Sequence, residues 1–407
     1  MTTRRTVVTA ALAGLATVLV VTGLTWASAT TSSPVPGVRI PNRATITVQG
    51  RGYGHGHGLS QYGAEGAARK GLSGAQIVRF YYPHTRAGTS QGPVRVHITA
   101  DTDDNTTVMA RSGLEVRSLA NRKTAAVPLK GAAGQASRWR LSAGSGGTTR
   151  VAYLHHGWHL WKNLQGDAEF RAGGPLQLVL PGPDVTYRGA LQSRTLPGAP
   201  ARQRVTVNRV SLDDYVRGVI PREMPALWHQ AALRAQAIAA RTYAAFEEAD
   251  STNPVYQLCD TTACQVYGGK SAEYPSTNEA TTATAGKIRT YQGAPAFTQF
   301  SSSSGGWTSD GGKPYLPAQK DPYDGWSGNA VHRWTTTVTS GAIEKAWPAL
   351  GNLTSISIDK RDGHGQWNGR VEEVTLHGSK ADRQLTGDDF RSALGLRSTW
   401  FTISVSS

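Results

Sequence analysis

Apolar and polar residues alternate over many short stretches in the first half of the chain. Between residues 94 and 210 the clearest examples are VRVHITA at 94–100, LQLVLPG at 176–182 and VTVNRVSL at 205–212, with Gly, Asp, Asn and Pro between such runs. A period of two places every second side chain on the same face of a strand. This part of the sequence therefore predicts an antiparallel β region of short strands joined by turns.

The period lengthens after residue 220. In PREMPALWHQAALRAQAIAARTYAAFEEA, residues 221–249, apolar residues recur mostly at steps of three or four, which predicts one or two helices. The recurring residues are Leu227, Ala231, Leu233, Ala237, Ala240 and Ala244. Residues 63–85 contain two shorter helical patterns, the second of which ends at Pro83. Residues 390–407 predict a helix followed by a strand. We therefore expect an α+β fold with mixed or antiparallel sheets.

The N-terminus has the features of an export signal. MTTRR is basic, residues 7–24 are apolar, and Ala27, Ser28 and Ala29 form a small-residue cleavage site. We expect residues 1–29 to direct the protein out of the cytoplasm. Because the apolar stretch approaches the roughly 20 residues of a membrane-spanning helix, an uncleaved leader that anchors the protein to the membrane is the alternative.

The chain is strongly basic, which predicts an acidic partner. Its 407 residues include 43 Lys and Arg against 28 Asp and Glu, a formal net charge of +15. The arginines are scattered, and the chain lacks the run of about five or six basic residues that is typical of a nucleic-acid-binding tail. We therefore expect no nucleic acid partner; an anionic polymer outside the cell agrees with the export signal.

Only two cysteines are present, Cys259 and Cys264. In an exported protein a disulfide is the expected state, and closing so short a loop would stabilise the fold by about 2 kcal/mol. Zinc is the alternative. It needs about four ligands, but no histidine lies between His229 and His332. We predict the disulfide, and no metal or other cofactor.

A glycine- and histidine-rich motif, GRGYGHGHGLSQYGA, occupies residues 50–64. Its strict alternation of glycine up to residue 58 differs from the G-x-G-x-x-G spacing of a phosphate-binding loop. In an extended strand the glycines would share one face, opposite Arg51, Tyr53, His55 and His57. A bare glycine face lets another segment or a ligand approach closely. A loop without function is the alternative.

Four segments together resemble the stage II sporulation protein D family, which includes peptidoglycan-cleaving proteins and amidase enhancers. They are LDDYVRGVIPREMPALWHQAALRAQAIAARTYA at 212–244, CDTTACQVYGG at 259–269, AFTQFSSSSGGWTSD at 296–310, and the motif at 50–64. In that family the glycine and histidine motif usually follows the Ser-Ser-Gly-Gly segment, whereas here it precedes the other three segments. We therefore expect the N-terminal motif to complete the same site and to pack close to the segment that bears Glu223. Some relatives bind zinc through a histidine before the second cysteine, where this chain has Ala263.

The resemblance implies a lytic transglycosylase that cleaves peptidoglycan glycan strands, with Glu223 as general acid and base. One carboxylate is enough if the C6 hydroxyl of muramic acid attacks C1 of its own ring, which yields a 1,6-anhydro product. The pKa of Glu223 must then be raised, and Met224, Pro225 and Trp228 are the expected apolar walls. A helix that begins near Pro225 would instead favour the charged form. The ordinary reading of a glutamate before a helix is a cap or an ion pair.

The same resemblance places substrate-binding residues on several segments. The set is His55, Ser60, Gln61, Arg241, Gln265, Tyr267, Ser302, Ser303 and Ser304. Arg241 has two further interpretations: it orients Glu223, or it is an ordinary surface arginine. For the serines the alternative is a flexible loop.

The expected partners are peptidoglycan glycan strands, and the amidase-enhancer relatives make a cell-wall amidase a second candidate. We expect the protein to be secreted or associated with the cell wall. Two other functions stay open: a non-catalytic wall-binding protein that activates an amidase, and a secreted zinc hydrolase that uses His55 and His57. A hydrolytic muramidase would need a second carboxylate, for which Asp260 and Asp310 are the candidates.

Taken together, these features divide the chain into six segments. They are a signal peptide (1–29), a linker (30–45), the segment with the glycine and histidine motif (46–90), a β-rich insert (91–205), a catalytic domain (206–315) and a C-terminal α+β segment (316–407).

Overall fold

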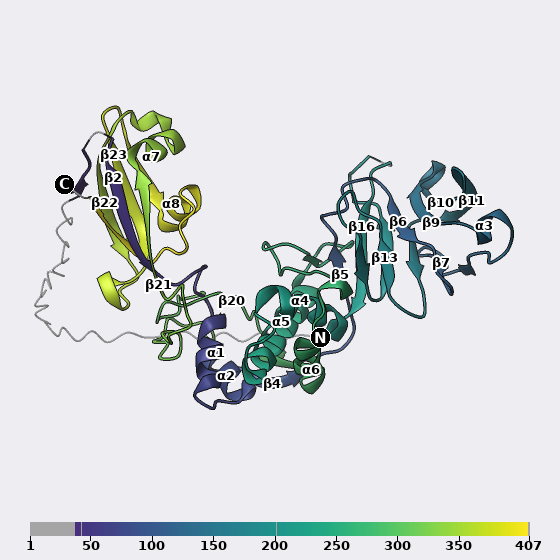
Figure 1. The fold of residues 1–407 in the computed structure, drawn as a ribbon, viewed down its shortest axis with the longest axis horizontal. Coiled ribbons are helices and arrows are strands. Elements are labelled where there is room, and N and C mark those ends of the chain that lie inside the picture. The colour runs from purple at the N-terminus through teal and green to yellow at the C-terminus, as the bar shows by residue number, and fades with distance from the viewer. Residues whose placement is uncertain (1–36, 42, 201, 406–407) are drawn as a thin grey trace, which may run out of the picture. The chain divides into compact units, whose positions relative to one another are not determined.

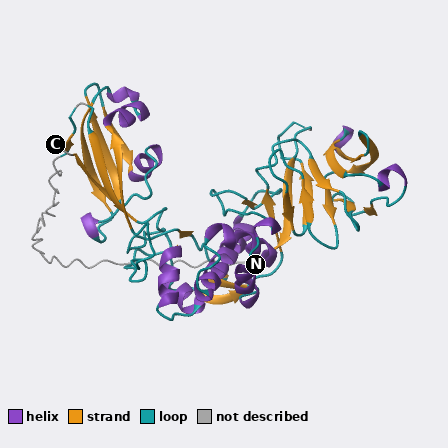
Figure 2. Ribbon diagram, viewed as in Figure 1, coloured by secondary structure: helices purple, strands orange, loops and turns teal. Residues whose placement is uncertain are grey.

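A computed structural model describes residues 37–405 apart from residues 42 and 201 (Figure 1). The predicted signal peptide lies outside the described residues. Helices and largely antiparallel sheets occupy separate stretches of the chain, which confirms the α+β prediction (Figure 2). Within the described part, none of the helices has the length and apolar character that crossing a membrane would require.

The predicted β region forms two sheets, with a short α-helix, α3 (Gly131–Gly134), and a short 3-10 helix (Ser145–Gly147) among their strands (Figure 2). The seven-stranded sheet has the order β17 (Leu258–Cys259), β5 (Pro93–His97), β16 (Val205–Ser211), β15 (Ala190–Arg194), β12 (Ala168–Arg171), β7 (Glu115–Ser118) and β8 (Thr124–Ala126). The six-stranded sheet has the order β11 (Trp158–Gln165), β10 (Thr148–Leu154), β9 (Arg138–Ala143), β6 (Thr106–Met109), β13 (Leu176–Leu178) and β14 (Val185–Tyr187). Trp139, Leu141, Phe170 and Leu191 from the two sheets share one hydrophobic core.

The helices gather around α5 (Gln230–Asp250), which contacts α1 (Gln61–Arg69), α2 (Gly74–Tyr81), α4 (Leu212–Glu223) and α6 (Pro275–Ala283). Its buried face consists mostly of alanine, including Ala235, Ala237, Ala239, Ala240 and Ala244. Side chains this small let four neighbouring helices approach a single axis closely.

The start of α4 departs from the prediction. The predicted helical stretch covers residues 221–249, with a helix start near Pro225, but Pro221 lies in the last turn of α4, which starts at Leu212, and α5 begins only at Gln230. The strand-like alternation of residues 205–212 runs directly into α4, where Ser211 ends the strand and accepts the capping hydrogen bond from the Asp214 N–H. The alternating pattern alone therefore could not indicate that β16 ends at Ser211 and that α4 begins at Leu212.

The C-terminal residues build a second hydrophobic core around two sheets and two helices, α7 (Ser340–Ala346) and α8 (Gly387–Ala393). One sheet contains β1 (Val38–Arg39), β22 (Leu353–Arg361), β23 (Val371–Gly378) and β24 (Asp382–Thr386). The other contains β21 (Arg333–Thr339), β2 (Thr45–Arg51) and β25 (Phe401–Val405). The N-terminal strands β1 and β2 thus belong to C-terminal sheets, although β1 lies in the segment predicted as a linker. The helix and strand expected at the end of the chain are α8 and β25.

Two small sheets complete the described fold. One has the order β19 (Ala294–Pro295), β18 (Lys287–Tyr291) and β4 (Arg86–Thr89). In the other, β3 (Leu59–Ser60) pairs in parallel with β20 (Phe300–Ser301). This second pairing attaches the glycine and histidine motif to the serine-rich segment.

Candidate active site

Glu223 is the last residue of α4, and two hydrogen bonds from distant segments hold its carboxylate. The backbone N–H of Val266 donates to Oε1 at 2.9 Å, and the side-chain amide of Gln61 donates from Nε2 to Oε2 at 3.4 Å. Val266 follows the second cysteine, and Gln61 begins α1. Three parts of the chain therefore converge on this one carboxylate.

A cavity of about 260 Å³ opens beside Glu223. The residues that line it are His55, Glu223, Tyr243, Thr262, Ala263, Cys264, Gln265, Gln299 and Phe300. His55 and Glu223 border the same space although they are far apart in the sequence. The predicted approach of the glycine and histidine motif to the segment that bears Glu223 is confirmed.

Burial raises the pKa of Glu223 above its ordinary value, while the hydrogen bonds from Val266 and Gln61 lower it by a smaller amount. The expected opposing effect of a helix N-terminus is absent, because Glu223 lies at the C-terminal end of α4. The partial negative charge at that end further disfavours the carboxylate anion. Position on the helix and burial therefore both favour a protonated Glu223.

The apolar walls of the cavity differ from those predicted. Tyr243, Phe300 and Cys264 supply them. Met224 is buried in the hydrophobic core, and Trp228 packs against Tyr62 with ring centroids 4.9 Å apart. Neither Met224 nor Trp228 is among the residues that line the cavity, and the same holds for Pro225. The correct walls come from segments far from Glu223 in sequence, so local sequence could not reveal them.

The glycine and histidine motif is not the extended strand that its alternation predicted. Regular strand β2 ends at Arg51, and Gly52, Gly54, Gly56 and Gly58 have φ between +64° and +98°. Glycine adopts such backbone angles far more readily than other residues. Space is also short, because a Cβ on Gly58 would lie 2.2 Å from the carbonyl oxygen of Gln299. The predicted close approach of another segment is correct, and its partner is the loop around residues 299–305.

His55 presents a neutral imidazole to the cavity. Burial, and then the nearby His57 and Arg370, lower the pKa of His55 to about 3. The backbone N–H of His57 donates to Nδ1 of His55 at 2.9 Å, which leaves Nε2 as the protonated nitrogen. His55 is therefore an uncharged ring at the cavity wall, and a hydrogen bond with the Phe300 backbone opposes part of the decrease in its pKa.

Comparison with known proteins shows which family this chain resembles. Residues 201–291 match the family described as "Stage II sporulation protein". "Stage II sporulation protein D" of Bacillus subtilis (strain 168) is 30% identical over 224 residues, which cover 48% of this chain and 61% of that protein. "Amidase enhancer" of the same organism is 41% identical over 135 residues, or 32% of this chain and 17% of that protein.

The chain carries a stage II sporulation protein D domain. "Stage II sporulation protein D" of Bacillus amyloliquefaciens, 30% identical over 222 residues, gives the same coverage of 48% and 61%. The chain thus spans less than two thirds of the length of each of these relatives. Glu223, Gln265 and the disulfide lie in the residues matched to the sporulation protein D domain. His55 and Phe300, which line the cavity, and Gln61, which donates to Glu223, lie outside those residues.

Arg241, within the sporulation protein D domain, is completely buried. Its Nε donates to Oδ1 of Asp213 at 2.7 Å, and its Nη1 donates to the carbonyl oxygens of Ala237 and Lys287. A guanidinium with these partners has no room for a substrate carboxylate, and it is no surface arginine either. The structure places Arg241 among the contacts that fix the start of α4 against α5 and β18.

Gln265 and Tyr267 occupy different environments. Gln265 lines the cavity, while its Oε1 accepts a hydrogen bond from the Tyr215 hydroxyl at 3.1 Å. Tyr267 is buried and donates from its hydroxyl to Oδ1 of Asn208 at 2.8 Å. Gln265 is also buried, and its Nε2 donates to the carbonyl oxygen of Ala240 at 3.4 Å, so Gln265 borders the cavity with its amide held by the protein. Tyr267 is a core residue.

The predicted serines mostly bind two buried aspartates that sequence reasoning missed. Ser60 and Ser303 donate to Asp324 at 2.7 and 2.9 Å, and Ser304 donates to Asp321 at 2.8 Å. We call these five residues the serine–aspartate cluster. None of them lines the cavity beside Glu223, and neither does Ser302. The cluster fastens the glycine and histidine motif to the serine-rich segment, so it positions the site rather than contacting a ligand there.

The pKa values of the two aspartates in the serine–aspartate cluster are shifted in opposite directions. Burial and the neighbouring Asp324 raise the pKa of Asp321. Burial also acts to raise the pKa of Asp324, but hydrogen bonds from His332, Ser60 and Ser303 outweigh it and lower that pKa. In the sequence, the only sign of this cluster is the pair of aspartates in DPYDGW at residues 321–326. Two aspartates in a polar loop are usually exposed, so this pair does not predict buried carboxylates.

The predicted disulfide between Cys259 and Cys264 is present, with the two Cα atoms 5.5 Å apart. Val266, the donor to Glu223, follows the closed loop just after Cys264. Among the residues that the structure describes, no group of three or more His, Cys, Asp or Glu side chains is arranged to hold a metal ion.

Proposed function

We propose that this protein is an exported lytic transglycosylase that cleaves the glycan strands of peptidoglycan, with Glu223 as general acid and base. The observation that carries the proposal is the setting of Glu223. Its pKa is raised, fixed donors orient it, and no second carboxylate is present among the residues that line its cavity. The similarity to proteins named for sporulation stage II and for amidase enhancement supports a role at the cell wall.

In the proposed reaction, protonated Glu223 donates its proton to the glycosidic oxygen that follows muramic acid. The bond between C1 and that oxygen breaks, and the C6 hydroxyl of the same muramic acid attacks C1. The hydroxyl proton passes to the Glu223 carboxylate, so acid and base are the same group and no water is consumed. The Val266 N–H and the Gln61 amide stabilise the anion that exists between the two proton transfers.

Neutral polar groups around Glu223 suit a sugar. His55, Gln265 and Gln299 line the cavity and offer hydrogen-bonding groups without charge. Hydroxyl groups both donate and accept, so neutral amides and an imidazole match them. We assign substrate binding to His55 and Gln265, and the positioning of Glu223 to Gln61.

The product of the reaction tests this proposal directly. We expect purified glycan to yield fragments with 1,6-anhydro-muramic acid ends, one water lighter than hydrolysed fragments, in the presence or absence of a chelator. Mass spectrometry of the digest distinguishes the two products. Asp260 binds the backbone and hydroxyl of Thr99, and Asp310 is exposed, so neither lines the cavity. Hydrated, reducing ends would therefore overturn the mechanism.

The pH profile of cleavage tests the role of Glu223 as the acid. Only the protonated form donates, so the rate falls as pH rises through the pKa of Glu223. Gln61→Leu removes a donor that favours the anion, which raises that pKa and moves the falling limb of the profile to higher pH. Gln384→Leu, at an exposed position on β24, is the control. A limb that stays in place, or moves to lower pH, contradicts the assignment.

An amidase activator is the second candidate function, because one relative is named an amidase enhancer. This role predicts that the protein leaves purified glycan intact and raises the rate of a cell-wall amidase on whole peptidoglycan. The glycan digest and an amidase assay with wild-type protein and Glu223→Gln separate the two candidates. Activation that survives the substitution, without any cleavage, favours the activator.

A further inference from the structure

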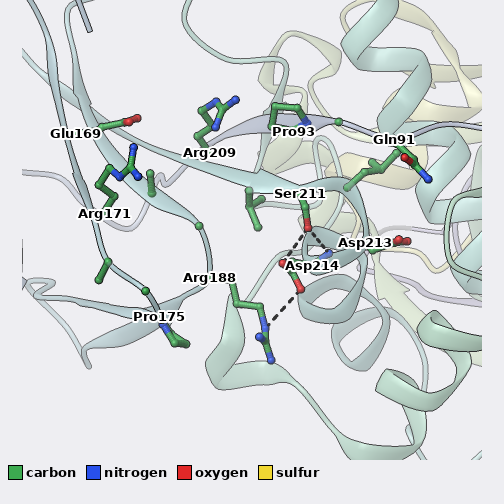
Figure 3. A pocket seen from close by; sticks show the side chains of 18 of the residues that line it. Gln91, Pro93, Glu169, Arg171, Pro175, Arg188, Arg209, Ser211, Asp213 and Asp214 are labelled. Carbon is green, nitrogen blue, oxygen red and sulfur yellow. Dashed lines mark hydrogen bonds and ion pairs between the residues drawn. The ribbon is translucent and has the colours of Figure 1, made fainter. Parts of the chain in front are cut away.

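A larger cavity, of about 810 Å³, lies between the seven-stranded sheet and the start of α4. Figure 3 shows the side chains of Arg171 and Arg209 from the sheet and of Arg188 from the β14–β15 turn around it, together with Asp213 and Asp214 at the start of α4. A volume of this order is typical of sites that bind small molecules, which occupy about 300–1,000 Å³.

The register of the sheet explains the hollow. Arg209 on β16 is paired with Ala190 on β15. Phe170 on β12 is paired with Leu191 on β15, and the same register continued by one residue brings Arg171 into the row of Ala190. Side chains in one row of a sheet point to the same face. The small side chain of Ala190 thus separates two arginines and leaves space between them. Glycines and a proline at residues 173–175 border that space.

Arg209 differs from Arg171 and Arg188, because no acidic side chain that the structure describes is paired with its guanidinium. Arg171 pairs with Glu115 at 3.2 Å, and Arg188 pairs with Glu273 at 2.9 Å. The exposed side chain of Arg209 makes no hydrogen bond or ion pair with any described residue. It also faces Arg95, its direct cross-strand partner on β5. Two like charges directly opposite each other destabilise a sheet, and an anion bound at Arg209 would relieve that cost.

This cavity is separate from the one beside Glu223. Asp213 and Asp214 border it at the first turn of α4, whereas Glu223 is the last residue of the same helix. At a rise of about 1.5 Å per residue, the two ends of α4 are roughly 16 Å apart. The two cavities share none of their lining residues. A ligand here would leave the reacting sugar free to occupy the other cavity.

We propose that this cavity binds the carboxylate-bearing stem peptide of peptidoglycan, with Arg209 as the group that pairs with the carboxylate. The choice of ligand rests on peptidoglycan being the substrate, as proposed above. The cavity also contains the carboxylates of Glu169, Asp213 and Asp214. These would repel a polyphosphate, but they suit the amide and ammonium groups that a peptide carries beside its own carboxylates.

Titration calorimetry with the full-length protein tests the proposal. The probes are a synthetic peptide of alanine, γ-linked glutamate and lysine with free carboxylates, the same peptide with its carboxylates amidated, and inorganic phosphate. We expect the free acid to bind and the amidated peptide to bind at least about tenfold more weakly, because a charge-assisted hydrogen bond is lost. Binding of phosphate without binding of the peptide would overturn the proposal in favour of a phosphate polymer.

Three variants locate the site. Arg209→Gln should weaken binding of the free acid by about tenfold, while Arg209→Lys, which keeps the charge, should restore most of it. Arg150→Gln removes an exposed arginine on β10, outside this cavity, and should leave binding unchanged. Equal binding by wild type and Arg209→Gln, or no binding by wild type, overturns the proposal.

The calorimetry also separates this proposal from the proposed function. Arg209→Gln should cleave peptide-free glycan at the wild-type rate, and Glu223→Gln should bind the peptide as wild type does. Failure of wild type to cleave glycan would refute the transglycosylase and leave the peptide titration standing. Cleavage without peptide binding would refute only the peptide site.

Discussion

Replacement of Glu223 by glutamine is expected to lower the rate of glycan cleavage by about 10²- to 10⁴-fold, the usual contribution of a general acid and base. Glutamine has nearly the same shape, so the Val266 N–H still finds an acceptor and the cavity keeps its volume. The amide cannot donate a carboxylic proton, and it cannot take the proton of the C6 hydroxyl. Cleavage is measured as the rate at which soluble fragments appear from purified glycan.

Glu279→Gln is the matched control for this experiment, because Glu279 lies on α6 with its side chain 62% exposed. It should cleave at the wild-type rate. Thermal unfolding and binding to insoluble peptidoglycan should be unchanged in both variants. A Glu223→Gln variant that turns over glycan within a few-fold of wild type would remove Glu223 from the mechanism.

Asp324→Asn is expected to lower the free energy of unfolding by about 3–5 kcal/mol, the range measured when one partner of a buried charged network is removed. The Asp324 side chain is fully buried and accepts hydrogen bonds only. The donors are the hydroxyls of Ser60 and Ser303, the backbone N–H groups of Ser304 and Gly305, the amide of Asn329 and the ring of His332. The amide of asparagine would point its own N–H groups at some of these donors.

Urea unfolding followed by circular dichroism measures this loss. Asp310→Asn is the control: Asp310 is exposed, and asparagine keeps the oxygen that accepts from the Gly312 N–H at 2.8 Å. It should differ from wild type by less than about 0.5 kcal/mol. An Asp324→Asn protein as stable as Asp310→Asn would show that the serine–aspartate cluster does not hold the fold together.

The serine–aspartate cluster also explains how an N-terminal motif serves a site built by residues far along the chain. Ser60 is at once the N-cap of α1 and a donor to Asp324, and the next residue, Gln61, donates to Glu223. The cluster thus sets the position of the first turn of α1. We expect variants that loosen the cluster to lose cleavage as well as stability, because the Gln61 amide and the His55 ring would lose their fixed places.

Much of the site could be predicted because its signals are local. The alternation of residues 94–210 reports strands directly, since side chains on a strand change face at each residue. The alanine-rich periodicity of residues 221–249 reports a closely packed helix. Two cysteines at short spacing in an exported chain indicate a disulfide, which the structure contains. The predicted proximity of His55 to Glu223 came from the resemblance and from the bare glycines.

The errors share a physical cause. Arg241 was a candidate for the surface or the substrate, yet it is the buried partner of Asp213, because its environment is made by α4, α6 and β18 rather than by its own helix. The predicted apolar walls of the cavity are residues next to Glu223 in the sequence. The observed walls include Tyr243 and Phe300, which belong to other segments. Alternation predicts a strand for the glycines of the motif, but their φ angles are positive because they fit against the loop around residues 299–305.

The sequence by itself determined the strands, the small-residue helices and the disulfide, since each depends on the chemistry or spacing of neighbouring residues. The choice of Glu223 as the candidate catalytic residue came from the family resemblance. Only the tertiary structure decided the direction of the Glu223 pKa shift, the burial of Asp321 and Asp324, and the cavity around Arg209. Burial and electrostatic environment are produced by segments that meet after the chain folds. Their energies depend on distances in space, which the order of residues along the chain does not contain.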